Sequence, residues 1–228
     1  MRSLDRLEIE QIASVNRIGA TARAREAQLR RIISATGLSA DNLKASTNSS
    51  DVGGPFVPFK LDPNGSLFER EVLRFQDSVV SADRLMRIVR ALPMGRPLPA
   101  SAAITSSFGT RVDPFNGRLA SHTGIDFREA HGAPVYASGS GRVVTASYNG
   151  GYGNMVEIDH GNGVTSRYAH LSAITVRDGQ QIGAGVMIGR IGSTGRSTGP
   201  HLHYEVRHND HPLDPRRFLA LREKIAIH

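Results

Sequence analysis

The sequence predicts an α+β protein, with a helical N-terminal region followed by a mostly antiparallel β domain. Two compositional observations divide the 228-residue chain near Pro93. Five of the 24 glycines precede Pro93 and 19 follow it, and all nine histidines follow it. Apolar residues recur at three- and four-residue steps in the first part, whereas short apolar runs between glycine-rich turns fill the second. We therefore expect a helical region over 1–92 and a β domain over 93–228.

A first helix is predicted over about 4–36. Gly37 is a natural stop for it, because glycine readily adopts the left-handed conformation found after helix ends. The expected buried seam is a single face with three- and four-residue steps, made of Ile12, Val15, Gly19, Ala22, Glu26, Leu29 and Ile33.

A second helix is predicted over about 66–92, after a polar and proline-punctuated linker over 37–65. Ser66 and Glu69 have the spacing of a capping box, and Pro93 ends the helix. The expected seam continues the same steps through Phe68, Val72, Phe75, Val79, Ala82, Met86 and Val89. An antiparallel hairpin, a dimeric coiled coil and a clamp on the second domain are all open arrangements of the two helices.

The second half reads as short strands. Runs such as GRVVTASY, NMVEIDH, GVTSRYAHL and HLHYEVRH are rich in β-branched and aromatic residues and are separated by NGGYG, GNG and GSTGRSTGP. No amphipathic helix is expected between them, so the sheet should be antiparallel.

Composition restricts the chemistry. The chain has no cysteine, so a metal ion would be held by histidine and carboxylate groups. No run approaches the roughly 18 apolar residues of a membrane span, and the first residues do not resemble a signal peptide. The formal charge of +7 suits a polyanionic neighbour or a merely solubilising surface. Nucleic acid is not expected as a partner, because basic and aromatic residues are not interleaved.

The sharpest local feature is the sequence from His201 to Val206. Side chains alternate along a strand, so His201, His203 and Glu205 would share one face while Leu202, Tyr204 and Val206 face the core. Two histidines on one face are a candidate metal or catalytic pair, although solvated histidines are the alternative.

Two further features supply similar chemistry. His122 and Asp126 have a spacing that places both side chains on one face of a strand or a helix. His170 lies in the run YAHL, which ends an apparent strand. Together the three features offer three ligands from two segments with a vacant fourth position. That pattern is typical of a catalytic rather than a structural zinc site.

The motifs HTGID, YAHLS and GSTGRSTGPHLHYE, in this order, resemble those of the lysostaphin-type zinc metallopeptidases, peptidase family M23. The resemblance runs from about Ser106 to Leu219. It implies a duplicated-hybrid-motif-like β fold with one Zn²⁺ per chain. By motif, it implies that His122, Asp126 and His203 are the zinc ligands and that His170 and His201 are the catalytic pair.

The resemblance also implies a function, namely zinc-dependent endopeptidase hydrolysis of peptide cross-links in bacterial peptidoglycan by a zinc-activated water assisted by two histidines. D-Alanyl–diaminopimelate bridges are the expected target. A catalytically silent member that binds the wall or activates another hydrolase is the alternative, although no expected ligand or catalytic residue is missing.

Peptidoglycan lies outside the cytoplasmic membrane, so we expect a periplasmic or extracellular protein, anchored through an upstream segment absent from this chain. The expected partners are peptidoglycan peptide stems. A homodimer, or contacts with cell-division or elongation proteins through the N-terminal helices, are alternatives left open. The linker segment 53–62 is a candidate gate across the groove.

Lesser candidates surround this set. Tyr152 and Asn154 are expected to contact substrate, as is Tyr168, with core packing as its alternative. Glu205 would either orient an imidazole or be a strand-surface charge. Arg167 stands where the family more usually has a small polar residue, and we interpret it as tuning the groove. The remaining histidines are expected on the surface: His131, His160, His208, His211 and His228.

Overall fold

The structure is a computed structural model and describes residues 3–43, 66–112 and 117–225. The chain divides into two compact units. One contains residues 1–34 and 39–89, and the other contains residues 35–38 and 90–228.

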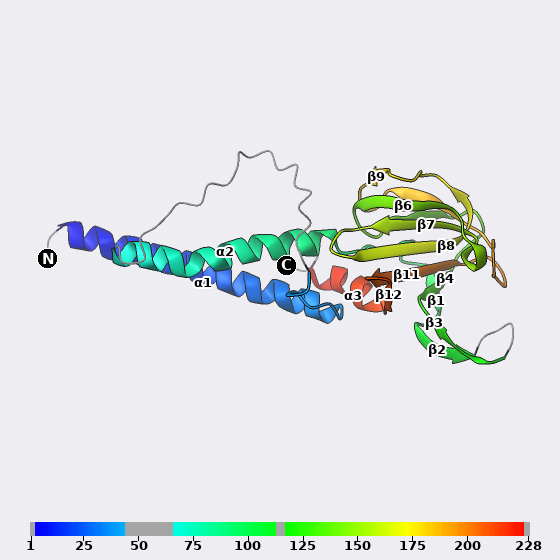
Figure 1. Ribbon diagram of the computed structural model, residues 1–228, viewed down its shortest axis with the longest axis horizontal. Coiled ribbons are helices and arrows are strands. Elements are labelled where there is room, and N and C mark those ends of the chain that lie inside the picture. Colours follow the sequence, from blue (N-terminus) through cyan, green and yellow to red (C-terminus); the bar gives the residue numbers. More distant parts are fainter. Residues whose placement is uncertain (1–2, 44–65, 113–116, 226–228) are drawn as a thin grey trace. The chain divides into compact units, whose positions relative to one another are not determined.

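The first unit contains nearly all of the helices α1 (Ser3–Ala35) and α2 (Leu67–Ala91), whose ends each lie within one residue of the predicted bounds. Both capping-box bonds are present, from Ser66 N to Glu69 Oε2 at 2.8 Å and from Glu69 N to Ser66 Oγ at 3.2 Å. The helices run side by side in the same direction (Figure 1), and the Ser81 hydroxyl donates to Glu26 at 2.8 Å. An antiparallel hairpin is therefore not the arrangement formed.

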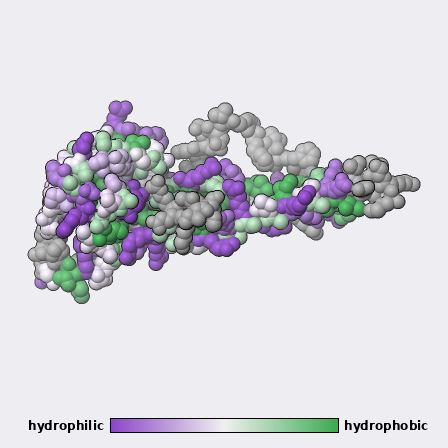
Figure 2. Space-filling model, turned by 180° about the vertical axis from the view of Figure 1, so that it is seen from behind, coloured by the Kyte–Doolittle hydropathy of each residue, from purple (hydrophilic) through white to green (hydrophobic). Residues whose placement is uncertain are grey.

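The seam predicted for α1 is confirmed, because Val15, Leu29 and Ile33 are buried. The seam predicted for α2 is partly wrong. Val79 is 41% exposed, whereas Leu85, which the predicted steps passed over, is 2% exposed. Neighbouring apolar residues on α2 offer two similar stripes, and packing selects between them. Figure 2 shows hydrophobic residues between hydrophilic ones along this unit, where Ile18 and Val80 are more than half exposed.

The second unit is built on a ten-stranded sheet, with the strand order β1-β4-β11-β8-β7-β6-β9 along its main path. Strands β10 and β12 pair with β8 and β11, and β5 pairs with β10. Every pairing between the described strands is antiparallel, as predicted. The strands of this sheet are β1 (Ala103–Ser106), β4 (Ile125–Arg128), β5 (Pro134–Tyr136), β6 (Gly141–Tyr148), β7 (Asn154–Asp159), β8 (Val164–Ile174), β9 (Gln181–Ile182), β10 (Met187–Ile191), β11 (Leu202–His208) and β12 (His211–Leu213).

A separate hairpin of β2 (Gly109–Val112) and β3 (Leu119–His122) extends from this sheet (Figure 1). Val112 and Leu119 pair across it and are 60% and 78% exposed. Hydrophobic colour is visible at this end of the unit in Figure 2.

The core lies on one face of the sheet. Tyr204 of β11 and Tyr168 of β8 are directly opposite each other, fully buried, with ring centroids 5.3 Å apart. Leu202 and Val206 are also fully buried, so the residues predicted to face the core do so. The opposite face of β11 is left to carry His203 and Glu205.

One helix of this unit was not predicted, and one expectation for the unit is wrong. A C-terminal helix, α3 (Pro215–Ile225), follows the sheet. Its signal was present, since Asp214 accepts a hydrogen bond from Arg216 N at 3.0 Å and Pro215 takes the first helical position. His160 was expected on the surface but is 6% exposed, because Ser140 O and Ser166 Oγ satisfy both ring nitrogens at 2.8 Å each.

Candidate metal centre and active site

Strands β4 and β11 bring the first two donors together. Asp126 and His203 occupy directly opposite positions of this antiparallel pair, on the face away from the tyrosine core. Opposite side chains in such a pair are near neighbours, and Asp126 Oδ1 lies 2.9 Å from His203 Nδ1.

His122 arrives from the other sheet. It ends β3, and Thr123 and Gly124 carry the chain around to β4, so the interval from His122 to Asp126 is a turn between two sheets. His122 and Asp126 therefore do not lie on one strand or one helix, as their spacing predicted. The turn between the two strands nevertheless brings the two side chains together. His122 Nε2 lies 3.1 Å from Asp126 Oδ1 and 3.1 Å from His203 Nδ1.

These three donor atoms fit a zinc ion. Ligands bound tetrahedrally at 2.0–2.2 Å lie about 3.3 Å from one another, close to the spacings between His122, Asp126 and His203. The far nitrogen of each ring is also occupied. His122 Nδ1 donates to the Ser107 carbonyl at 2.8 Å, and His203 Nε2 faces Glu205 Oε1 at 2.9 Å. Such partners fix which ring nitrogen is presented to a metal.

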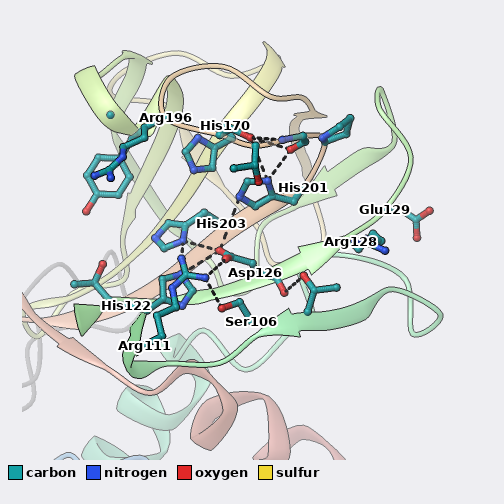
Figure 3. A pocket seen from close by; sticks show the side chains of 18 of the residues that line it. Ser106, Arg111, His122, Asp126, Arg128, Glu129, His170, Arg196, His201 and His203 are labelled. Carbon is teal, nitrogen blue, oxygen red and sulfur yellow. Dashed lines mark hydrogen bonds and ion pairs between the residues drawn. The ribbon is translucent and has the colours of Figure 1, made fainter. Parts of the chain in front are cut away.

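His170 and His201 lie beside this donor set, with ring centroids 4.8 Å apart (Figure 3). Simple alternation along β8 would place His170 on the core side with Tyr168. Instead the register with β7 shifts here and His170 has a φ of 61°, so a bulge turns the ring away from the core. His170 Nδ1 donates to Thr194 O and His201 Nδ1 to Gly199 O, each at 2.8 Å. In each ring, Nε2 is therefore the nitrogen that can exchange a proton with substrate or water.

The local charges favour a cation between the donors. Burial acts to raise the pKa of Asp126, but hydrogen bonds from His122 and His203 outweigh it and hold this pKa far below its usual range. Burial acts to lower the pKa of His203, but hydrogen bonds to Asp126 and Glu205 raise it to about 9. Two carboxylates thus stabilise positive charge at the position where a metal would replace a proton.

His170 has the opposite electrostatics. Burial lowers its pKa to about 4, aided by the nearby His201 and His203, while the hydrogen bond to Thr194 O acts in the other direction. At neutral pH the ring is uncharged, and its Nε2 is an acceptor.

The site opens into a groove of about 1020 Å³ that all five residues line. Figure 3 shows Arg196 on one side of the histidines, and Arg128 and Glu129 on another. Both arginines are exposed, so the groove can meet a carboxylate-bearing ligand.

The three candidate substrate contacts differ in whether they line the groove. Tyr152 lines the groove. Asn154 does not line it, and its amide donates to Leu171 O at 3.0 Å. Tyr168 is fully buried, with its hydroxyl bonded to Ser138 N at 2.8 Å and Ser166 Oγ at 3.0 Å, which favours the core-packing alternative.

The sequence analysis did not identify two residues of the site. Arg111 of β2 bonds Ser106 Oγ at 2.6 Å and lies 3.4 Å from Asp126 Oδ2, the oxygen turned away from the histidines. Thr123 donates to Glu205 Oε1 at 2.5 Å. Thr123 lies within the motif HTGID, and Arg111 lies within the stretch from Ser106 that carries the resemblance, but only the tertiary contacts show what they touch.

Comparisons with known proteins match the part of the chain that carries this site. The model of peptidase family M23 matches residues 120–215, an interval that contains all five candidate ligand and catalytic residues. The catalytic domain of lysostaphin from Staphylococcus simulans is 35% identical, over 52% of this chain and 92% of that domain, with a TM-score of 0.48. Residues 120–215 therefore form a domain of peptidase family M23, a family of metallopeptidases.

Individual relatives are similar over about half of the chain. A zinc-containing peptidase from Vibrio cholerae is 40% identical, with a TM-score of 0.50, over 52% of this chain and 37% of that one. The DD-carboxypeptidase/endopeptidase Mpg of Neisseria meningitidis is 51% identical over 112 residues, which are 49% of this chain and 26% of that protein. The peptidoglycan DD-endopeptidase ShyA of Vibrio cholerae is 44% identical over 119 residues, 52% of this chain and 28% of that protein. The chain thus spans about a quarter of these curated relatives.

Among the residues that the structure describes, no helix combines the length and the apolar character needed to cross a bilayer.

Proposed function

We propose that this protein is a zinc-dependent endopeptidase that hydrolyses peptide cross-links in bacterial peptidoglycan. The convergence of His122, Asp126 and His203 on one point, with His170 and His201 beside it in one groove, is the observation that carries the proposal. The names of Mpg and ShyA support the same substrate. In this proposal the protein holds one Zn²⁺ per chain and acts outside the cytoplasmic membrane, on the peptide stems of the wall.

In this proposal, the zinc ligands and the two other histidines have different roles. Bound by His122, Asp126 and His203, Zn²⁺ would supply an acidified water and polarise the scissile carbonyl. His170 Nε2 is placed to accept a proton, because its Nδ1 donates to Thr194 O and the ring, whose pKa burial lowers to about 4, is uncharged at neutral pH. His201 Nε2 lies 4.0 Å from Asp126 Oδ1 and would hydrogen-bond the developing oxyanion when it carries a proton, because an unprotonated imidazole nitrogen is only an acceptor.

The proposed cleavage site is the D-alanyl–diaminopimelate bridge. This bond carries a free carboxylate beside the scissile nitrogen, whereas a glycine bridge carries none. The exposed Arg128 and Arg196 of the groove suit that carboxylate. Tyr152 would contact the peptide from the groove wall.

Purified wall provides the test. We expect the protein to release soluble muropeptides whose masses correspond to opened D-alanyl–diaminopimelate bridges, and to leave a pentaglycine peptide uncut. A chelator should abolish release, and Zn²⁺ should restore it. Intact cross-links after incubation with fully zinc-loaded protein would favour the silent scaffold, which has no need of His170 and His201.

Substitutions separate metal binding from proton transfer. His170→Ala and His201→Ala should each lower turnover by about 10²- to 10⁴-fold with zinc content unchanged. His203→Ala should lose the metal, measured by elemental analysis of dialysed protein. Zinc at full occupancy in His203→Ala would overturn the ligand assignment. His208→Ala, a half-buried histidine of the same strand, is the matched control.

A further inference from the structure

A row of alternating charge crosses the groove face of the sheet next to the metal donors. Glu157 of β7, Arg167 of β8 and Glu205 of β11 are directly opposite one another in the strand register. Glu205 is 0% exposed and Glu157 is 9% exposed. A buried carboxylate at this position needs compensating charge and hydrogen bonds.

Glu205 uses its two oxygens differently. Oε1 faces the site, where it accepts hydrogen bonds from the Thr123 hydroxyl, from the Tyr152 hydroxyl at 3.1 Å and from His203 Nε2 at 2.9 Å. Oε2 faces away, where Arg207 Nη1 donates to it at 2.7 Å and Arg167 Nη1 lies 4.0 Å from it. One carboxylate therefore joins a zinc-ligand candidate to two arginines that do not line the groove.

Both arginines are themselves held in place. Arg167 Nε lies 3.1 Å from Glu157 Oε2, and Arg167 Nη2 donates to Asp210 Oδ1 at 3.4 Å. Its guanidinium also lies over the Tyr152 ring, 5.9 Å from the centroid. Arg207 Nη2 donates to the Asp210 carbonyl at 2.6 Å. The turn between β11 and β12 thus anchors the arginines, which hold Glu205.

We propose that Arg167 and Arg207 are positioning residues, which act on His203 through Glu205 and so set the affinity and geometry of the zinc site. The inference rests on the proposed function, because it takes His203 as a zinc ligand. His203 presents Nδ1 to the metal only while Nε2 is engaged, and Glu205 provides that contact. A guanidinium retains its charge and its planar fork at any physiological pH, so the two arginines keep Glu205 fixed.

The proposed role of Arg167 differs from the expectation that this residue tunes the groove. Arg167 does not line the groove, and its only contact there is with the ring of Tyr152. Its side chain, 17% exposed, instead lies between Glu157 and Glu205.

Zinc affinity of the whole chain, measured by competition with a chromophoric chelator, tests the proposal. Glu205→Gln should weaken binding by about 10- to 100-fold, the range typical of groups that support metal ligands. Arg207→Met and Arg167→Met should each weaken it by about 3- to 30-fold, the larger effect at Arg207, which makes the shorter contact. Arg142→Met, at an exposed arginine on β6 outside this row, should bind as the unchanged protein does.

Double variants show whether the arginines act through Glu205. In the Glu205→Gln background, Arg207→Met and Arg167→Met should cause no further loss of zinc affinity, because the intermediary is already disabled. Unchanged affinity in both single arginine variants would overturn the proposal, as would losses that persist undiminished in that background.

A spectroscopic readout distinguishes positioning from general destabilisation. With Co²⁺ in place of zinc, the visible spectrum should change in Glu205→Gln and Arg207→Met, remain unchanged in Arg142→Met, and be partly restored in Arg167→Lys relative to Arg167→Met. If Arg207→Met fails to fold, the two Arg167 variants carry the test. Absence of zinc binding by the unchanged protein would instead contradict the proposed function.

Discussion

The histidines of the site differ in what holds their far nitrogen. His122, His170 and His201 each donate to a backbone carbonyl, of Ser107, Thr194 and Gly199 respectively. His203 alone among these four faces a carboxylate there. A backbone carbonyl is fixed by the fold, whereas a side chain must itself be held, which is why His203 depends on the partners of Glu205.

Gly124 makes room for this arrangement. A Cβ at this position would lie 2.4 Å from Tyr204 O and 2.9 Å from Glu205 Cγ. Gly124→Ala should therefore destabilise the protein by about 1–3 kcal/mol, because β11 must shift. Urea unfolding of the metal-free protein measures this change, and its zinc affinity should fall as well. Gly151→Ala is the control, since a Cβ there meets nothing within 4 Å. Equal stability of the two variants would contradict the argument.

Strand β8 contributes side chains to both faces of the sheet. Its residues Ser166 and Tyr168 enter the core, Arg167 and Ala169 share the other face, and the bulge then turns His170 toward the groove. On the core side Tyr168, Ser166 and His160 form a continuous hydrogen-bonded chain that ends at Ser140 O. This chain satisfies buried polar groups that would otherwise be costly.

His160, which precedes β8, makes the free energy of unfolding depend on pH. Burial lowers its pKa below 6.5, outweighing its hydrogen bond to Ser140 and the charge of Asp159. Below about pH 6.5 the unfolded chain binds a proton that the folded chain resists, so the free energy of unfolding should fall as the pH decreases through this range.

Urea unfolding at pH 7.5, 6.5 and 5.5 tests this dependence. The unchanged protein should lose more stability on acidification than His160→Gln, whose amide can form similar hydrogen bonds without titrating. Parallel stability curves for the two proteins would show that another group is responsible.

The candidate site belongs to one of the two compact units of the chain. The candidate site lies entirely in the unit containing residues 90–228, and the helical unit contributes none of its five ligand and catalytic residues. The candidate gate, residues 53–62, lies outside the described residues and stays a prediction. The suggestions of a dimer, of division or elongation partners and of an upstream anchor likewise stay predictions.

A truncation tests the gate at this scale. A fragment of residues 93–228 should bind zinc as tightly as the whole chain, because every donor and supporting group named above lies within it. If the linker gates the groove, the fragment should release muropeptides from purified wall several-fold faster than the whole chain. Equal rates would leave the gating hypothesis without support.

The sequence by itself determined the capping box and the antiparallel sheet, and it predicted the two-part organisation and the site residues. These follow from local signals: periodicity, glycine and histidine placement, and motifs whose residue types suit zinc. Only the tertiary structure decided the parallel course of the helices, the bulge at His170 and the paths of Arg111, Arg167 and Arg207 to their carboxylates. Strand register and packing across distant segments fix those contacts, and no local pattern of residues encodes them.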